Sequence, residues 1–208
     1  AVVIRFATLE ETRQQALRDV LDEIAAAYPE GASVFILGRY NPWLPTYGLP
    51  YPNEQRLLRR EHGSLRLDFP TIHGAKGLEA DVVGICDLVE GFRDLRGFPS
   101  SIENDPLLQL PLPHPDPFPD AEERRLLYVA ITRARDRVYL MAELGPPSSF
   151  ITELSDAEAY PAVTVRGAPT RCPRCQSGFL RWCKAGTDSF IGCSDHPACS
   201  HSRPAPEP

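Results

Sequence analysis

Five of the six cysteines in this 208-residue sequence lie after residue 170, and four of them have the spacing of a metal site. Cys172 and Cys175 form a C-x-x-C pair, and Cys193 and Cys199 follow after a loop of 17 residues. A structural zinc ion takes four thiolate or imidazole ligands in a tetrahedron, and these ligands often lie in two close pairs. We therefore expect Cys172, Cys175, Cys193 and Cys199 to bind Zn²⁺.

Disulfides and free thiols are the alternatives for these cysteines. The N-terminal residues lack the pattern of a secretion signal, which favours metal over disulfides. A module of fewer than about 40 residues rarely folds without one or the other. Cys183 is expected to be a free thiol in a hairpin, and His196 or His201 could replace a cysteine as a ligand.

The cysteine-rich segment is also basic, although the chain as a whole carries a net charge of −6. Residues 166–203 hold six basic and two acidic residues, so they carry +4, while residues 1–165 carry −9. Guanidinium groups beside aromatic rings suit single-stranded nucleic acid, because the cations meet phosphates and the rings stack on bases. The candidates are Arg174, Arg181, Trp182 and Phe190. Alternatively, the aromatic rings form a small core and the arginines only solubilise it.

The string CPRCQSGFLRW followed by FIGCSDHPAC resembles the zinc ribbon of topoisomerases over about 30 residues. In that family the module binds single-stranded DNA. The resemblance therefore implies a structural zinc ion and a single-stranded DNA ligand for this segment. The rival reading is that the ribbon docks onto a protein.

A second group of polar residues lies in the string TIHGAKGLEADVV, between two predicted strands. Thr71, His73, Lys76 and Glu79 offer polar groups, and the glycines let backbone amides approach a ligand. A glycine-rich turn after a strand can hold a phosphate backbone. Most such turns, however, are only turns.

A third group lies in EERRLLYVAITRARDRVYL, residues 122–140. Its apolar residues predict a packed helix, with Tyr128 among them, and Asp120 with Glu123 forms a capping-box pattern before it. Arg133 and Arg135 then lie near the C-terminal end of this helix. Taken alone, the pattern favours a helix with a solvated basic end.

Together, the strings VFILGRYN, TIHGAKGLEADVV and AEERRLLYVAITRARDRV resemble motifs IV, V and VI of superfamily 1 UvrD-like helicases. The resemblance implies that Arg39 and Arg133 reach the γ-phosphate of ATP, where cations stabilise the transferring phosphoryl group. It places Glu79, with Gly77, near the nucleotide. It also places Thr71, His73 and Lys76 along single-stranded DNA.

The sequence contains no Gly-Lys dipeptide, so it has no phosphate-binding loop to hold the β-phosphate and Mg²⁺. The resemblance implies that an N-terminal RecA-like domain supplies this loop. We expect a C-terminal part of a 3′→5′ helicase, acting on single-stranded DNA or DNA with single-stranded tails in the bacterial cytoplasm or nucleoid. Alone it should not hydrolyse ATP. The alternative is a non-catalytic adaptor for DNA or protein, built from a degenerate motor domain.

These groups require elements that hold them, and the pattern predicts an α/β fold with a mostly parallel sheet. Strands are expected at 1–6, 33–37, 65–69, 81–86 and 138–141, alternating with helices. Seven prolines between Pro99 and Pro119 predict an extended surface segment. No run of about 18 apolar residues exists, so no membrane span is expected. The predicted organisation is a RecA-like domain at 1–155, a linker at 156–170, a zinc ribbon at 171–203 and a disordered tail at 204–208.

Overall fold

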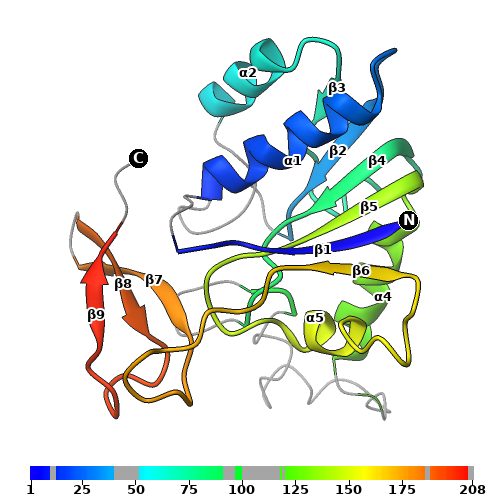
Figure 1. The fold of residues 1–208 in the computed structure, drawn as a ribbon. Coiled ribbons are helices and arrows are strands. Elements are labelled where there is room, and N and C mark those ends of the chain that lie inside the picture. The colour runs from blue at the N-terminus through cyan, green and yellow to red at the C-terminus, as the bar shows by residue number, and fades with distance from the viewer. Residues whose placement is uncertain are drawn as a thin grey trace, which may run out of the picture.

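A computed structural model of the chain shows a large parallel β-sheet covered by helices, with a small antiparallel sheet beside it (Figure 1). The proline-rich segment predicted between Pro99 and Pro119 falls largely outside the described residues. The structure describes residues 1–9, 13–39, 52–90, 97–99, 118, 120–185 and 188–205.

The large sheet has six parallel strands in the order β3-β2-β4-β5-β1-β6. Its central strands are apolar and buried on both faces, as expected for a parallel sheet with helices on each side. This confirms the predicted fold class. The strands are β1 (Val2–Phe6), β2 (Ser33–Leu37), β3 (Arg66–Asp68), β4 (Ala80–Ile85), β5 (Ala134–Ala142) and β6 (Val163–Arg166).

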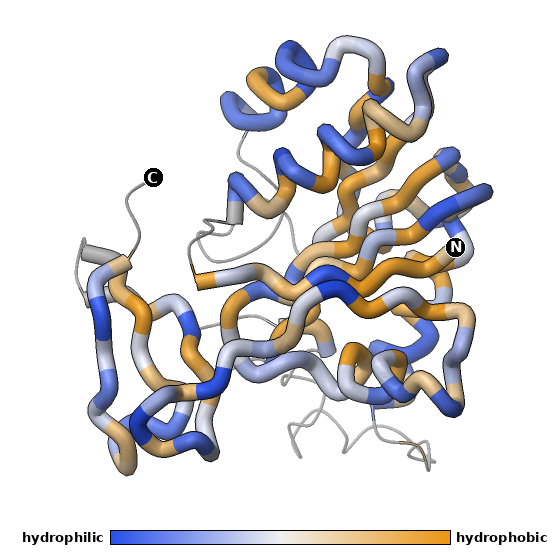
Figure 2. Tube along the Cα trace, viewed as in Figure 1, coloured by the Kyte–Doolittle hydropathy of each residue, from blue (hydrophilic) through white to orange (hydrophobic). Residues whose placement is uncertain are grey.

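Helices α1 (Arg13–Ala27) and α2 (Pro52–Glu61) pack on one face of this sheet, and α4 (Ala121–Ile131) and α5 (Ser149–Leu154) pack on the other. Figure 2 shows the apolar residues gathered on the strands and on the sides of the helices that face them. Ser148 caps α5 by accepting a hydrogen bond from the Ile151 amide. None of the described helices combines the length and the apolar character needed to cross a membrane.

The small sheet contains β7 (Leu180–Ala185), β8 (Asp188–Cys193) and β9 (Ser202–Pro204), all antiparallel. It lies against the large domain rather than apart from it (Figure 1). Leu144, two residues beyond β5, is buried in the same apolar cluster as Cys172, Leu180 and Ile191. The core of the small sheet is therefore completed by a side chain of the large domain.

Parallel pairing gives the large sheet two distinct edges. Leu37 is in register with Ile85, and both end their strands at what we call the carboxyl edge. Ala80 is in register with Ala134, and both begin their strands at the amino edge. The segment 71–79 and helix α4 each run from the carboxyl edge to the amino edge over the same face of the sheet.

The chain between the two sheets corrects the prediction of a linker over residues 156–170. Val163–Arg166 form β6, which pairs with β1 from Val2↔Val163 to Arg5↔Arg166. The strand is only four residues long, and its Val-Thr-Val-Arg alternation was not recognised as a strand, although backbone pairing with β1 holds it at the edge of the sheet. The last strand, β9, likewise includes Pro204, the first residue of the predicted disordered tail.

Candidate functional site

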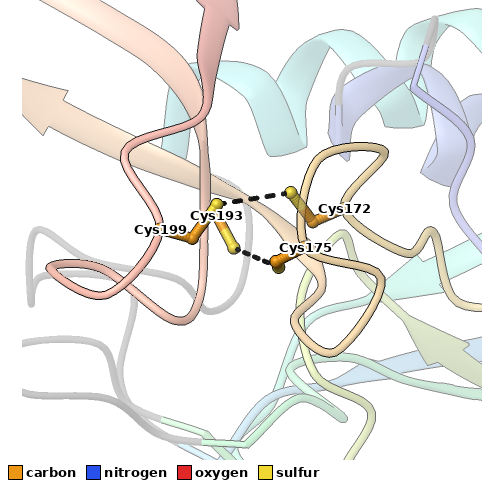
Figure 3. Close-up of side chains that lie close together, drawn as sticks. All are labelled: Cys172, Cys175, Cys193 and Cys199. Atoms are coloured by element: carbon orange, nitrogen blue, oxygen red, sulfur yellow. Dashed lines mark hydrogen bonds between the residues drawn. The ribbon is translucent and has the colours of Figure 1, made fainter.

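Four cysteine side chains from two facing segments of the small domain point toward one another, as Figure 3 shows. The sulfur atoms of Cys172, Cys175, Cys193 and Cys199 all lie within 4.8 Å of one another. The Sγ–Sγ distances are 3.9 Å for Cys172–Cys199 and 3.6 Å for Cys175–Cys193. A disulfide needs about 2.05 Å, whereas a tetrahedron with Zn–S bonds of 2.3 Å has S–S edges of about 3.8 Å. The geometry therefore fits a tetrahedral Zn²⁺ site and not a disulfide framework.

Backbone amides and small residues shape this cluster. The Gly178 amide donates to the Cys175 sulfur, and the Asp195 amide donates to the Cys193 sulfur, each at 3.4 Å. A Cβ atom at Gly178 would lie 2.7 Å from the Asp195 carboxyl group and 2.8 Å from the Cys193 sulfur, so only glycine fits there. The Ser177 hydroxyl, followed by the Gly178 amide, lowers the pKa of Cys175 to about 6, whereas burial raises the pKa of Cys193 to about 12.

The other proposed ligands lie outside the cluster. Among the described residues, the group that could hold a metal contains the four cysteines and neither His196 nor His201. Cys183 lies on β7, where its thiol contacts the carbonyl oxygen of Arg181 at 3.8 Å. The prediction that Cys183 is a free thiol is therefore consistent with its position away from the metal ligands.

The basic and aromatic residues of the small domain separate into two groups. Arg174 is exposed and donates to the Ser200 hydroxyl, so its position suits a ligand contact. Arg181, by contrast, is only 9% exposed, and its Cβ atom lies 3.8 Å from the Cβ position of Gly145 in the large domain. The burial of Arg181 beside Gly145 therefore favours a packing role over the expected DNA contact.

The aromatic side chains of the small domain are partly committed to packing. Trp182 is half-buried against the apolar cluster that holds the cysteines, and Phe190 is also half-buried. The Arg171 guanidinium lies over the Phe179 ring, 4.6 Å from its centroid. A stacking role for Trp182 or Phe190 remains a proposal that must accommodate this packing.

The segment 71–79 alternates between anchors and exposed polar residues. Ile72 and Ala75 are fully buried, whereas His73 and Lys76 are exposed. The Thr71 hydroxyl accepts a hydrogen bond from the Gly74 amide at 3.0 Å and so closes the turn. The buried residues hold the turn against the sheet and present its polar residues outward.

At the amino edge, Gly77, Glu79 and Arg133 lie near one another. The Arg133 guanidinium donates to the Leu78 carbonyl at 3.2 Å and to the Val129 carbonyl at 2.9 Å. Glu79 is exposed and pairs with Arg135 at 3.2 Å. Gly77 has a φ of +83°, and no atom lies within 4 Å of its Cβ position, so space is open beside it. These residues form a polar surface with both signs of charge.

Arg39 does not lie in this group. Its guanidinium makes three hydrogen bonds, of 2.7 to 3.1 Å, to the carboxylate of Glu123. Glu123 lies in the first turn of α4 at the carboxyl edge, and Arg133 follows the other end of that helix. The ten steps from Glu123 to Arg133 correspond to about 15 Å of helical rise. The structure therefore separates the two arginines that were expected to reach one γ-phosphate, and we retain only Arg133 for that role.

Glu123 is the residue that sequence reasoning missed. It was interpreted as half of a capping box, but Asp120 has a φ of +53° and its side chain makes no capping hydrogen bond. The Glu123 side chain is instead 1% exposed. The available signal was its spacing, because Glu123, Leu127 and Ala130 occupy one face of the helix. Tyr128, which was expected to pack, is 70% exposed.

Comparisons with known proteins place these observations in a family. The family model described as the UvrD-like helicase C-terminal domain matches residues 53–144. DNA helicase IV of Escherichia coli K12 is 39% identical over 150 residues, covering 72% of this chain and 20% of that protein. ATP-dependent DNA helicase UvrD1 of Mycobacterium tuberculosis H37Rv is 35% identical over 104 residues, covering 45% of this chain and 12% of that protein. The chain thus spans a fifth or less of the length of these two relatives.

The solved structures include the C-terminal domain of a possible DNA helicase from Lactobacillus plantarum. It is 15% identical, and the superposition covers 80% of this chain and 84% of that chain, with a TM-score of 0.41. This score is too low to bear on the arguments above.

We expect the chain to bind one zinc ion and the Cys199→Ser variant to lose it. The ribbon should lose its structure with the metal, because zinc binding by such modules contributes on the order of 10 kcal/mol to folding. Metal analysis of the purified protein measures the stoichiometry. Cys183→Ser is the matched control and should keep its zinc; stoichiometric zinc in Cys199→Ser would contradict the assignment.

We also expect Glu123→Ala to lower the free energy of unfolding by about 3–5 kcal/mol, because it leaves the Arg39 guanidinium without its buried partner. Urea denaturation of the 208-residue chain measures this change. The neighbouring Glu122 pairs with Arg125 on the solvent side of the same turn. Glu122→Ala should therefore change stability by less than about 1 kcal/mol, and equal losses in both variants would refute the distinction.

Proposed function

We propose that this chain is the second motor domain of an ATP-dependent DNA helicase, because residues 53–144 match the family model of the UvrD-like helicase C-terminal domain. The observation that carries the proposal is segment 71–79, which runs from the carboxyl edge to the amino edge and presents polar residues along its length. The polar surface at the amino edge suits a nucleotide. The polar surface at the carboxyl edge, beside the zinc ribbon, suits single-stranded DNA.

The nucleotide surface is built on Arg133. Its described contacts to Val129, Leu78 and Thr132 use three of the five guanidinium N–H groups and fix the plane of the side chain. The remaining N–H groups can meet a γ-phosphate, whose negative charge during transfer a preorganised cation stabilises. Glu79, held by Arg135, lies beside it. The β-phosphate and Mg²⁺ would be held by a phosphate loop on a first motor domain, since this chain has none.

The DNA surface is built on the segment 71–79. His73 and Lys76 are exposed on a turn that Ile72 and Ala75 hold in place, so their polar groups are available to successive phosphates. The turn begins at Thr71, which forms a β-bridge with Gly38 at the carboxyl edge. Closure of the two motor domains on ATP would move this surface relative to the DNA strand and so drive translocation. The resemblance to the family implies that this translocation runs in the 3′→5′ direction.

The zinc ribbon supplies a second contact to the same strand. It packs at the carboxyl edge through Leu144, so it is positioned by the motor domain. Arg174, inside the turn between Cys172 and Cys175, is exposed and would meet a phosphate. Arg181 instead contributes to the contact between the ribbon and the motor domain. Zinc is required here for structure, not for chemistry.

We expect the 208-residue chain to bind a (dT)20 oligonucleotide and to bind it more weakly after Lys76→Ala or Arg174→Ala. Each lost phosphate contact should reduce the slope of log affinity against log salt by about 0.7. Fluorescence anisotropy at several salt concentrations measures both quantities. Arg66→Ala is the control, because Arg66 is exposed at the opposite edge of the sheet. Equal effects of all three substitutions would show that the chain binds the oligonucleotide only through nonspecific electrostatic attraction.

We further expect Arg133→Ala to reduce ATP hydrolysis by about 10³-fold or more when the chain is joined to a first motor domain. Loss of the cation removes stabilisation of the transferring phosphoryl group. Steady-state ATPase assays with single-stranded DNA measure this effect, and Arg125→Ala, an exposed arginine of the same helix, is the control. DNA-stimulated turnover by the 208-residue chain alone, or full activity of Arg133→Ala, would contradict the proposal. ATP hydrolysis by the 208-residue chain alone would also contradict the alternative of a non-catalytic adaptor. That alternative predicts no hydrolysis by the chain alone or by the chain joined to a first motor domain.

A further inference from the structure

We infer that the Arg39–Glu123 ion pair positions the DNA segment 71–79 relative to helix α4, and thereby couples that segment to Arg133 at the other end of the helix. The inference rests on the proposed function and adds two positioning residues to it. Neither residue needs to touch DNA or nucleotide for this role.

The first set of contacts joins segment 71–79 to helix α4 at the carboxyl edge. The Gly38 carbonyl accepts a hydrogen bond from the Ile72 amide at 3.0 Å, and Gly38 forms a parallel bridge with Thr71. The next residue, Arg39, directs its side chain to Glu123, in the first turn of α4. Through two consecutive residues, the start of the DNA segment is therefore joined to the start of the helix.

The second set of contacts joins segment 71–79 to the end of helix α4 at the amino edge. The Arg133 guanidinium donates to the Leu78 carbonyl at 3.2 Å, and the Arg133 carbonyl accepts from the Ala80 amide at 2.9 Å. The end of the DNA segment is therefore joined to the end of the helix. Between the two links, both elements contribute buried residues to one apolar cluster, namely Ile72, Ala75, Leu127 and Ala130.

Segment 71–79 and α4 are thus joined to each other at both ends, and between these ends they share one apolar cluster. Glu123 lies in the first turn of this 11-residue helix and Arg133 follows its C-cap residue, so in this inference the helix carries a displacement of Arg133 to Glu123. The Arg39–Glu123 link is suited to transmit that displacement, because three hydrogen bonds fix its direction and the Glu123 side chain is 1% exposed. A bidentate guanidinium–carboxylate pair constrains geometry in a way that a nonpolar contact does not.

The pair is testable in the 208-residue chain by hydrogen exchange with and without (dT)20. In the unsubstituted chain, DNA should slow amide exchange in residues 71–79 and also in α4, the latter by about 2- to 30-fold, the range that such couplings span. In Glu123→Gln and Arg39→Lys, protection of residues 71–79 should persist while the α4 response is lost. Glu122→Gln removes the same charge from the solvent side of the same turn and should behave like the unsubstituted chain.

The outcomes separate this inference from the proposed function. An undiminished α4 response in folded Glu123→Gln would overturn the coupling role and leave DNA binding at residues 71–79 intact. Absence of protection at residues 71–79 in the unsubstituted chain would overturn both. If Glu123→Gln loses its cooperative melting transition, the paired substitution Arg39→Met with Glu123→Leu fills the same space without a buried charge. Loss of the α4 response in that folded variant would support the inference, and its persistence would overturn it.

Discussion

Parallel strand pairing is the constraint on which the rest of the structure depends. A parallel ladder cannot be closed by a tight hairpin, so every connection must cross a face of the sheet before the next strand begins. Segment 71–79 crosses in this way between β3 and β4, and α4 does so between β4 and β5. Both connections therefore begin at the carboxyl edge, beside the ribbon, and end at the amino edge, beside Arg133. The topology therefore places Thr71 and Glu123 at the carboxyl edge and Arg133 at the amino edge.

Predictions from the sequence succeeded where a pattern had only one structural interpretation. The strand at 33–37 was predicted with its observed bounds because an apolar, β-branched run ends at a glycine, and the four cysteines were identified by spacing alone. They failed where one residue satisfied two patterns. Glu123 fits both a capping box and an apolar helix face, and only the position of Arg39, 84 residues earlier in the chain, decides between them. Separation in space was also hidden, since Arg39 follows a strand and Arg133 precedes one, and this order places them at opposite edges.

The ribbon shows why a count of charges does not describe a surface. The +4 of residues 166–203 suggested a uniformly basic ligand site, but the arginines differ in what they contact. Arg171 covers the Phe179 ring, Arg181 packs at the large domain, and Arg174 is exposed. Alternation along β7 accounts for Arg181, because Leu180 enters the cluster with the cysteines and the next side chain therefore faces the other way, whereas Arg171 and Arg174 precede this strand. Leu144 then fills the remaining side of that cluster, which makes the orientation of the ribbon a property of the motor domain.

The buried position of Glu123 is costly unless geometry compensates for it. Removing a carboxylate and a guanidinium from water costs several kcal/mol per ion, and apolar residues of similar volume often stabilise a fold equally well or better. Stability alone therefore does not account for an ion pair at this position. An apolar contact would hold α4 against the sheet but would allow it to slide, whereas the three hydrogen bonds between Arg39 and Glu123 fix both distance and orientation. Because Gly38 fixes the backbone beside Arg39 to Thr71, the same geometry extends to the segment that presents His73 and Lys76. The Arg39–Glu123 ion pair therefore fixes the position of helix α4 relative to segment 71–79.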